Sequence, residues 1–114
     1  MPGPEPALSP IDTFQFLHYN LLRAIEASTD GAATSTMRQA DNVIQDAITA
    51  LNRADFRART AEFQQLTGQI NAQLTQLKAL KEDMSRIVAD VTLAAKVVDG
   101  IDSAIGVAAK IFPI

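Results

Sequence analysis

The chain of 114 residues contains no cysteine, no tryptophan and a single histidine, His18. The absence of cysteine excludes disulfide bonds, a thiol nucleophile and any zinc site built on thiolates. One histidine also falls short of the paired Glu-x-x-His ligands that a di-metal site in a helical bundle requires. We therefore interpret His18 as a surface or core-edge residue, and we expect neither a metal ion nor another cofactor.

Basic residues are few and dispersed, since ten Lys and Arg stand against thirteen Asp and Glu, for a formal net charge of -3. Neutralising phosphates requires a concentrated basic surface, so we expect no nucleic-acid partner. The densest basic cluster is Arg53, Arg57 and Arg59. We interpret it as complementing a helix end rather than as a phosphate site, because no glycine-rich phosphate loop accompanies it.

The acidic residues do not suggest catalysis. Glu82 and Asp83 are adjacent, and Asp99 and Asp102 are three residues apart. Acid–base chemistry needs a carboxyl group that is desolvated beside a polar pocket, whereas lysine and arginine residues near these four indicate ordinary solvated helix pairs. We expect a protein that is not an enzyme.

Signals for export or membrane insertion are also missing. The first basic residue is Arg23, so the amino terminus has no cationic start of a signal peptide. Residues 87–112 are apolar enough to consider as a span, but five charges interrupt them, each costing about 2.5–3.5 kcal/mol at a bilayer centre. We expect a cytoplasmic protein, with export by a non-classical route left open.

Helix-forming residues dominate the composition, which is 47% hydrophobic but only 5% aromatic. No alternating pattern of β-branched residues predicts a sheet, so the fold is expected to be all-α and a single domain. Residues 1–10 carry four prolines and are predicted to be a disordered tail. The helical domain covers residues 11–114, with helices predicted at about 11–28, 34–54 and 57–112.

The first two predicted helices have recognisable ends. Ser9 or Asp12 is expected to cap the first helix, and Gly31 to terminate it. Caps for the second helix are sought among residues 34–36, and Asp41 falls on its polar side. Phe16 and Tyr19 are predicted to lie off the apolar face of the first helix, which is made by Phe14, Leu17, Leu21, Leu22 and Ile25.

The dominant feature is a heptad-like row of apolar residues between Phe63 and Phe112, without proline and with only Gln73 interrupting it. A single helix over this stretch is about 75 Å long at 1.5 Å per residue, more than the first two helices can cover. The helix either breaks near residues 81–85 to give a four-helix bundle, or stays whole and pairs with another chain. We favour the unbroken helix, because Leu80, Met84 and Ile87 keep the row in phase.

The two halves of this segment predict different surfaces. The first half has one narrow row, in which Gln73 is a candidate for fixing register, and we expect it to mediate self-association through Leu66, Ile70, Gln73, Leu77 and Leu80. The second half has an additional row, and Gly100 within it predicts close approach of another helix. We expect a partner to bind this second row, which comprises Leu93, Val97, Gly100, Ala104, Val107 and Ile111.

Burial of apolar helix faces is therefore the expected activity. The sequence favours a non-catalytic protein–protein interaction module, such as an adaptor, secretion-system chaperone or immunity-type accessory protein, acting on a protein partner or as a homo-oligomer. In its small size, acidity, lack of cysteine and long hairpin-like helix the chain resembles bacterial secretion-system accessory proteins in general, although it matches no family motif. The alternative is a membrane-active secreted protein that uses the amphipathic segment 87–112.

Overall fold

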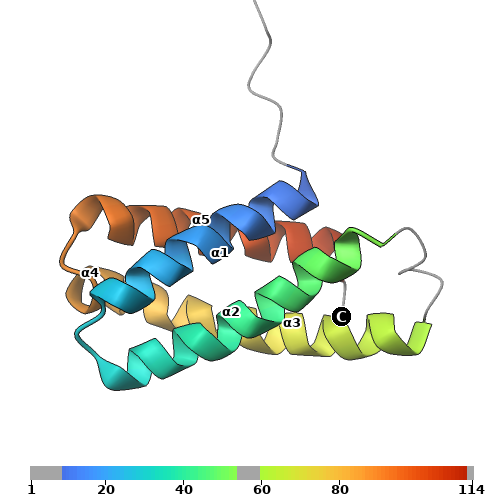
Figure 1. The fold of residues 1–114 in the computed structure, drawn as a ribbon, viewed down its shortest axis with the longest axis horizontal. Helices are drawn as coiled ribbons and strands as arrows, with labels where there is room; N and C mark the ends of the chain where they lie inside the picture. The colour runs from blue at the N-terminus through green and yellow to red at the C-terminus, as the bar shows by residue number, and fades with distance from the viewer. Residues whose placement is uncertain (1–8, 54–59, 113–114) are drawn as a thin grey trace, which may run out of the picture.

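The structure is a computed structural model that describes residues 9–53 and 60–112, and its helices form a four-helix bundle (Figure 1). The long helices are α1 (Pro10–Ala27), α2 (Gly31–Leu51), α3 (Thr60–Leu80) and α5 (Val91–Ile111). A 3-10 turn, η2 (Lys81–Asp83), and a single helical turn, α4 (Met84–Ile87), connect α3 to α5. The all-α prediction is confirmed.

The beginning of α1 follows directly from its sequence. The Ser9 side chain accepts a hydrogen bond from the backbone N–H of Asp12 at 3.1 Å, and Pro10 occupies the first turn, where no N–H is needed. The fully buried residues Phe14, Leu17 and Leu21 then recur at intervals of three and four. Leu22 departs from the prediction, because it is 44% exposed.

The beginning of α2 corrects the predicted loop. Asp30 is the N-cap, and its side chain accepts from the backbone N–H of Ala33 at 3.0 Å. Gly31 therefore begins α2 instead of terminating α1, and no described glycine has a positive φ. The predicted caps Thr34, Ser35 and Thr36 lie inside α2, because Asp30, an equally good or better cap residue, starts the helix earlier and small residues at 31–33 fit its first turn.

The preference for one unbroken helix over 57–112 is wrong, and the alternative four-helix bundle is confirmed. After Leu80 the chain tightens into η2, and Val88 leaves α4 in an extended conformation with φ -120° and ψ 114°. Asp90 then caps α5 by accepting from the N–H of Leu93 at 3.1 Å. The apolar row continues in heptad phase through the bend. This is compatible with the fold, because α3 and α5 both turn that row toward the same core.

Each long helix packs against two others around that core. α1 contacts α5 and α2, α2 contacts α3, and α3 contacts α5. In Figure 1, α1 and α2 form the layer nearest the viewer, α3 and α5 lie behind them, and consecutive long helices run in opposite directions. The largest fully buried side chains come from all four long helices and α4; they include Phe14, Leu17, Met37, Ile44, Ile70, Leu77, Met84 and Ile101.

Specific contacts fix both ends of the bundle. At one end the ring of Phe112 lies 6.3 Å from that of Phe14 and 5.6 Å from that of Phe63, and Asn71 donates to the Phe112 carbonyl at 2.9 Å. At the other end the N–H of Thr29 donates to the Ile87 carbonyl at 3.1 Å. An isolated bridge between Ser28 and Val88 lies beside that bond, so the α1–α2 loop holds the α4–α5 connection.

None of the helices within residues 9–53 and 60–112 has the length and apolar character of a membrane span. Most large apolar side chains of α4 and α5 face the bundle, where Ile87, Ala94, Val97 and Ile101 are at most 4% exposed; Val91 is an exception.

Candidate functional site

The second row of α5, predicted to bind a partner, lies inside the bundle. Leu93, Val97, Gly100, Ala104 and Ile111 are buried, and Val107 is half-buried against the core. A Cβ on Gly100 would lie 3.2 Å from Leu17 Cδ1, so the helix that approaches closely is α1 of the same chain. Because the folded chain covers this row itself, the row offers no free docking surface.

The residues predicted to mediate self-association are also packed within one chain. Leu66, Ile70 and Leu77 are buried in the core, and Leu80 packs against it. Gln73 is half-buried, and its side-chain carbonyl oxygen is buried without a hydrogen-bond partner. The prediction assumed a straight helix that exposes this row to water. Because the chain folds back after α3, the row is covered by other helices of the same chain instead.

The charged residues singled out in the sequence lie at the surface. Arg53 pairs with Glu62 at 3.4 Å, whereas Arg57 and Arg59 lie outside the described residues. Asp83 pairs with Arg86 at 3.1 Å, and Lys81 pairs with Asp102, linking η2 to α5. Glu82 and Asp99 are exposed. Within the described ranges, no group of three or more His, Asp and Glu side chains is arranged to hold a metal ion.

Sequence reasoning missed a buried polar cluster between α1 and α2. His18 Nδ1 lies 2.6 Å from Asp41 Oδ1, and Gln45 donates to Asp41 Oδ2 at 2.8 Å. The Asp41 side chain is only 4% exposed, against 29% for His18. A buried carboxylate must be hydrogen-bonded, and here both oxygens are. The available signal was the position of Asp41, between Met37 and Ile44 on the buried side of α2.

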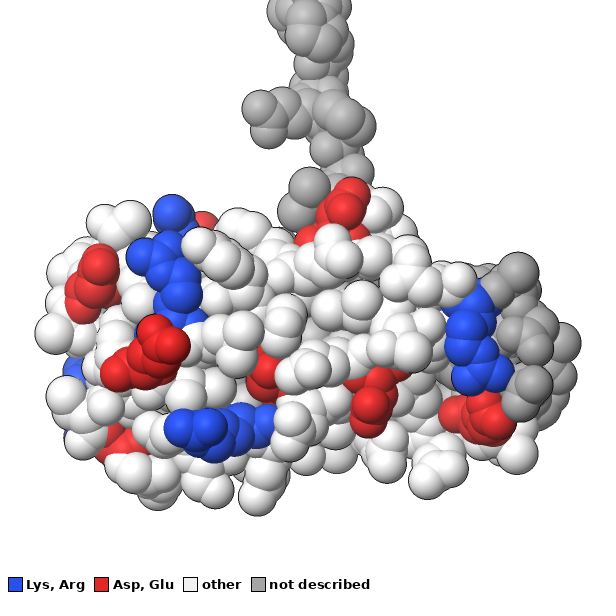
Figure 2. Space-filling model, in the orientation of Figure 1, with Lys and Arg blue, Asp and Glu red and all other residues white. Residues whose placement is uncertain are grey.

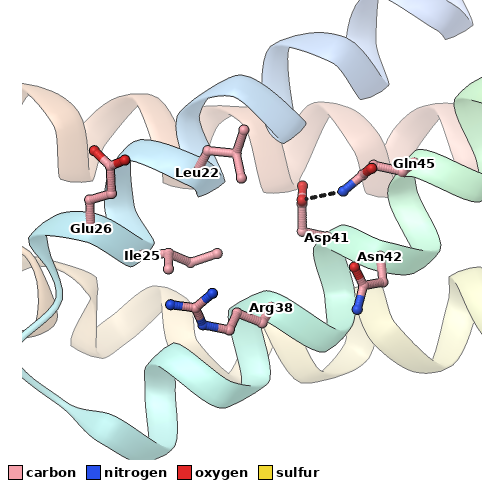
Figure 3. Close-up of a pocket in the computed structure, with 7 residues that line it drawn as sticks. All are labelled: Leu22, Ile25, Glu26, Arg38, Asp41, Asn42 and Gln45. Atoms are coloured by element: carbon pink, nitrogen blue, oxygen red, sulfur yellow. Dashed lines mark hydrogen bonds between the residues drawn. The ribbon is translucent and has the colours of Figure 1, made fainter.

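A groove of about 380 Å³ opens beside this cluster, between α1 and α2 (Figure 3). We call it the α1–α2 groove, and it is lined by Leu22, Ile25, Glu26, Arg38, Asp41, Asn42 and Gln45. Arg38 and Glu26 are exposed, and neither forms an ion pair within the described part of the chain. The groove therefore combines apolar walls with one cation and one anion that are free to bind other groups.

The outer surface of α1 carries the exposed apolar side chains. Phe16 is 37% exposed, Tyr19 60% and Leu22 44%; we call these three residues the α1 patch. Phe16 lies near Gly100 of α5, and Leu22 lines the α1–α2 groove, so the patch crosses α1 from one neighbouring helix to the other. The guanidinium of Arg23 lies 5.7 Å from the centre of the Tyr19 ring, a cation–π arrangement.

The face that contains α1 and α2 carries charges of both signs (Figure 2). Positive and negative side chains are interspersed across it, some of them in contact with each other, without a large area of one sign. Such a face fits a protein surface better than a polyanion, which requires clustered cations.

No family model, no curated protein and no solved structure matches the chain.

Proposed function

We propose that this chain is a non-catalytic binding module that docks one amphipathic helix of a partner protein on the α1 patch and the α1–α2 groove. The observation that carries the proposal is the uneven placement of exposed apolar side chains. Of the four large ones in the described residues, three lie on α1. The fourth, Val91, stands alone at the start of α5, so the exposed large apolar side chains are grouped only on α1 within the described residues.

The composition of the α1 patch supports protein binding. Tyrosine and arginine are enriched at the energetically dominant positions of interfaces, and aromatic rings supply large area with few rotatable bonds. Tyr19 and Arg23 already stack on each other, which reduces the entropy lost when a partner orders them. From Phe16 to Leu22 the patch extends about 9 Å along α1, the length of almost two helical turns.

The groove supports a specific kind of partner. Leu22 and Ile25 form apolar walls, and Arg38 stands opposite Glu26 across the opening (Figure 3). Arg23 and Arg38 flank the patch, whereas Asp41 is already satisfied by His18 and Gln45. The matching ligand is an amphipathic helix with apolar residues one turn apart and at least one carboxylate that pairs with Arg38.

This mode of action is that of an adaptor, a secretion chaperone or an immunity-type accessory protein, all of which act by covering a partner segment. The polar cluster of His18, Asp41 and Gln45 beside the groove does not support a catalytic function. Both oxygens of Asp41 are occupied by interhelical and intrahelical partners, which suits a carboxylate that joins α1 to α2.

The test is site-specific photo-crosslinking in the native cell extract. A photoreactive residue replaces Tyr19 or Leu22 in two variants, and replaces Gln76, an exposed residue of α3, in the matched control. We expect one shared adduct from the α1 positions, none from position 76, and crosslinked peptides that map to an amphipathic helix carrying a carboxylate.

A further variant, Arg38→Glu, should abolish this adduct while leaving the circular dichroism spectrum unchanged. Adducts of equal yield from position 76, or no adduct at position 19 and at position 22, would contradict the proposal.

A further inference from the structure

The connection between α3 and α5 contains nothing that forbids a helix. Residues 81–90 include neither proline nor glycine, and η2 and α4 within them are already helical. The apolar row continues in phase through Leu80, Met84 and Ile87 to Val91 and Ala94. The same residues are therefore compatible with a bend and with one continuous helix.

Val91 is the member of the apolar row that the bent form leaves in solvent. It is 76% exposed, whereas the described members of the same apolar row on either side, from Phe63 to Phe112, are buried or half-buried. It is exposed because the chain bends one turn earlier and α5 starts at this position. In a continuous helix Val91 would lie one turn beyond Ile87 on the same apolar face.

The bend is held by the burial of Met84, Ile87 and Val88 in the core and by a few polar contacts. Ile87 accepts the N–H of Thr29 at 3.1 Å, Asp90 caps α5, and Lys81 pairs with Asp102. In a continuous helix the Ile87 carbonyl would instead accept from the N–H of Val91, and the backbone of residues 88–90 would gain intrahelical bonds. Straightening therefore exchanges one set of hydrogen bonds for another.

We infer that a second copy of this chain is a binding partner through exchange of α5. The segment from Thr60 to Ile111 straightens into one helix of about 75–80 Å, and α5 of each copy packs on α1 and α3 of the other. Every helix contact of the closed chain is then regained between copies, except at the connection. There, Met84, Ile87 and Val91 of the two straight helices pack against each other, and Val91 becomes buried.

Val91→Pro separates the two forms. In the closed chain position 91 is the first residue of α5, where proline is favoured, and Asp90 has the extended conformation (φ -71°, ψ 107°) required before proline. The first bond of α5 runs from the N–H of Ala94 to the Asp90 carbonyl at 2.9 Å, so the N–H of Val91 is not needed. In the continuous helix the same proline disfavours straightening about a hundredfold per chain.

The experiment compares the wild type with Val91→Pro, Val91→Ala and Asp90→Ala. Each protein is unfolded, refolded at millimolar concentration and analysed by size-exclusion chromatography with light scattering. We expect a slowly dissociating dimer for the wild type, a larger dimer fraction for Asp90→Ala, which lacks the cap of the bend, and none for Val91→Pro. Val91→Ala controls for the loss of the side chain and retains a dimer.

Distances between spin labels identify the exchange itself. Because the chain has no cysteine, Thr75→Cys and Gly106→Cys give two unique label sites, beside a pocket that α3 and α5 share. With unlabelled protein in excess, the intrachain distance is short in the monomer and about 45 Å in the exchanged dimer. A dimer that keeps the short distance, a dimer of Val91→Pro, or no dimer from any variant overturns the inference.

Discussion

The two most apolar long helices, α1 and α5, use their apolar residues in opposite ways. Beyond Val91, α5 buries or half-buries both of its rows, because it packs against α1, α3 and α4. α1 packs mainly against α5 and α2 among the described helices, and it leaves Phe16, Tyr19 and Leu22 in contact with solvent. The broader apolar face of α5 is therefore mostly core, whereas three of the four large exposed apolar side chains of the described residues lie on α1.

The largest effect is expected from a charge in the second row of α5. Val97→Glu should lower the free energy of unfolding by about 4 kcal/mol or more, enough to unfold many small domains, because it buries a carboxylate at a position that is 0% exposed. Urea denaturation followed by circular dichroism measures the change.

Val91→Glu is the matched control on the same helix. Position 91 is exposed and lies in the first turn of α5, where a negative charge is favourable, so stability should be unchanged or slightly increased. If Val97→Glu were as stable as Val91→Glu, the second row would be accessible and the contrast between α5 and α1 would fail.

A smaller effect is expected where α1 meets α2. His18→Ala should lower the free energy of unfolding by about 1–3 kcal/mol, because Asp41 Oδ1 stays buried and loses its partner. Gln15→Ala, at an exposed position one turn earlier on α1, should change stability by less than about 0.5 kcal/mol.

Adding Asp41→Asn to His18→Ala tests the origin of that loss. A neutral amide costs less to bury than a carboxylate, so the double variant should be more stable than His18→Ala alone. Equal stability of the two variants would mean that Asp41 becomes hydrated when His18 is removed.

A glycine pair on α5 tests how closely α1 approaches it. A Cβ at position 106 has no atom within 4 Å, so Gly106→Ala should stabilise the protein by about 0.5–1 kcal/mol through helix propensity alone. A Cβ at position 100 would lie 3.2 Å from the Cδ1 of Leu17, which is fully buried. Gly100→Ala should therefore be less stable than Gly106→Ala by about 1 kcal/mol or more, as measured by thermal unfolding.

Helix type and core register were predictable because they depend on local periodicity. Phe14, Leu17 and Leu21 recur at helical spacing and are buried, and Ser9 is a cap readable from residue type. The bend at residues 81–90 was misjudged because heptad phase is the same for a straight helix and for two helices that fold back on one core. The contacts that distinguish them include bonds from Thr29 to Ile87 and the pair of Lys81 with Asp102, which join residues far apart in the sequence.

The candidate site was less predictable than the fold. Asp41 was assigned to a polar face by residue type, although its two partners bury it. Leu22 was assigned to the core by residue type, although it lines the α1–α2 groove and is 44% exposed. Both errors concern residues at the edge of an apolar stripe, where the position of the neighbouring helix decides burial and the sequence contains no record of that position.

The smallest effect on stability is expected for a substitution in the α1 patch. The adjacent residues Leu21 and Leu22 allow this to be tested. Leu22→Ser should change the free energy of unfolding by less than about 1 kcal/mol, because a side chain that is 44% exposed loses little burial. Leu21→Ser, one residue earlier and 0% exposed, should cost about 3 kcal/mol or more through a cavity and a buried hydroxyl. Urea denaturation of both variants measures the difference. Under the proposed function, Leu22→Ser still loses the crosslinked adduct of Tyr19, since the residue contributes surface to the partner rather than to the core. Retention of that adduct at full yield would place the docked helix elsewhere than over the groove.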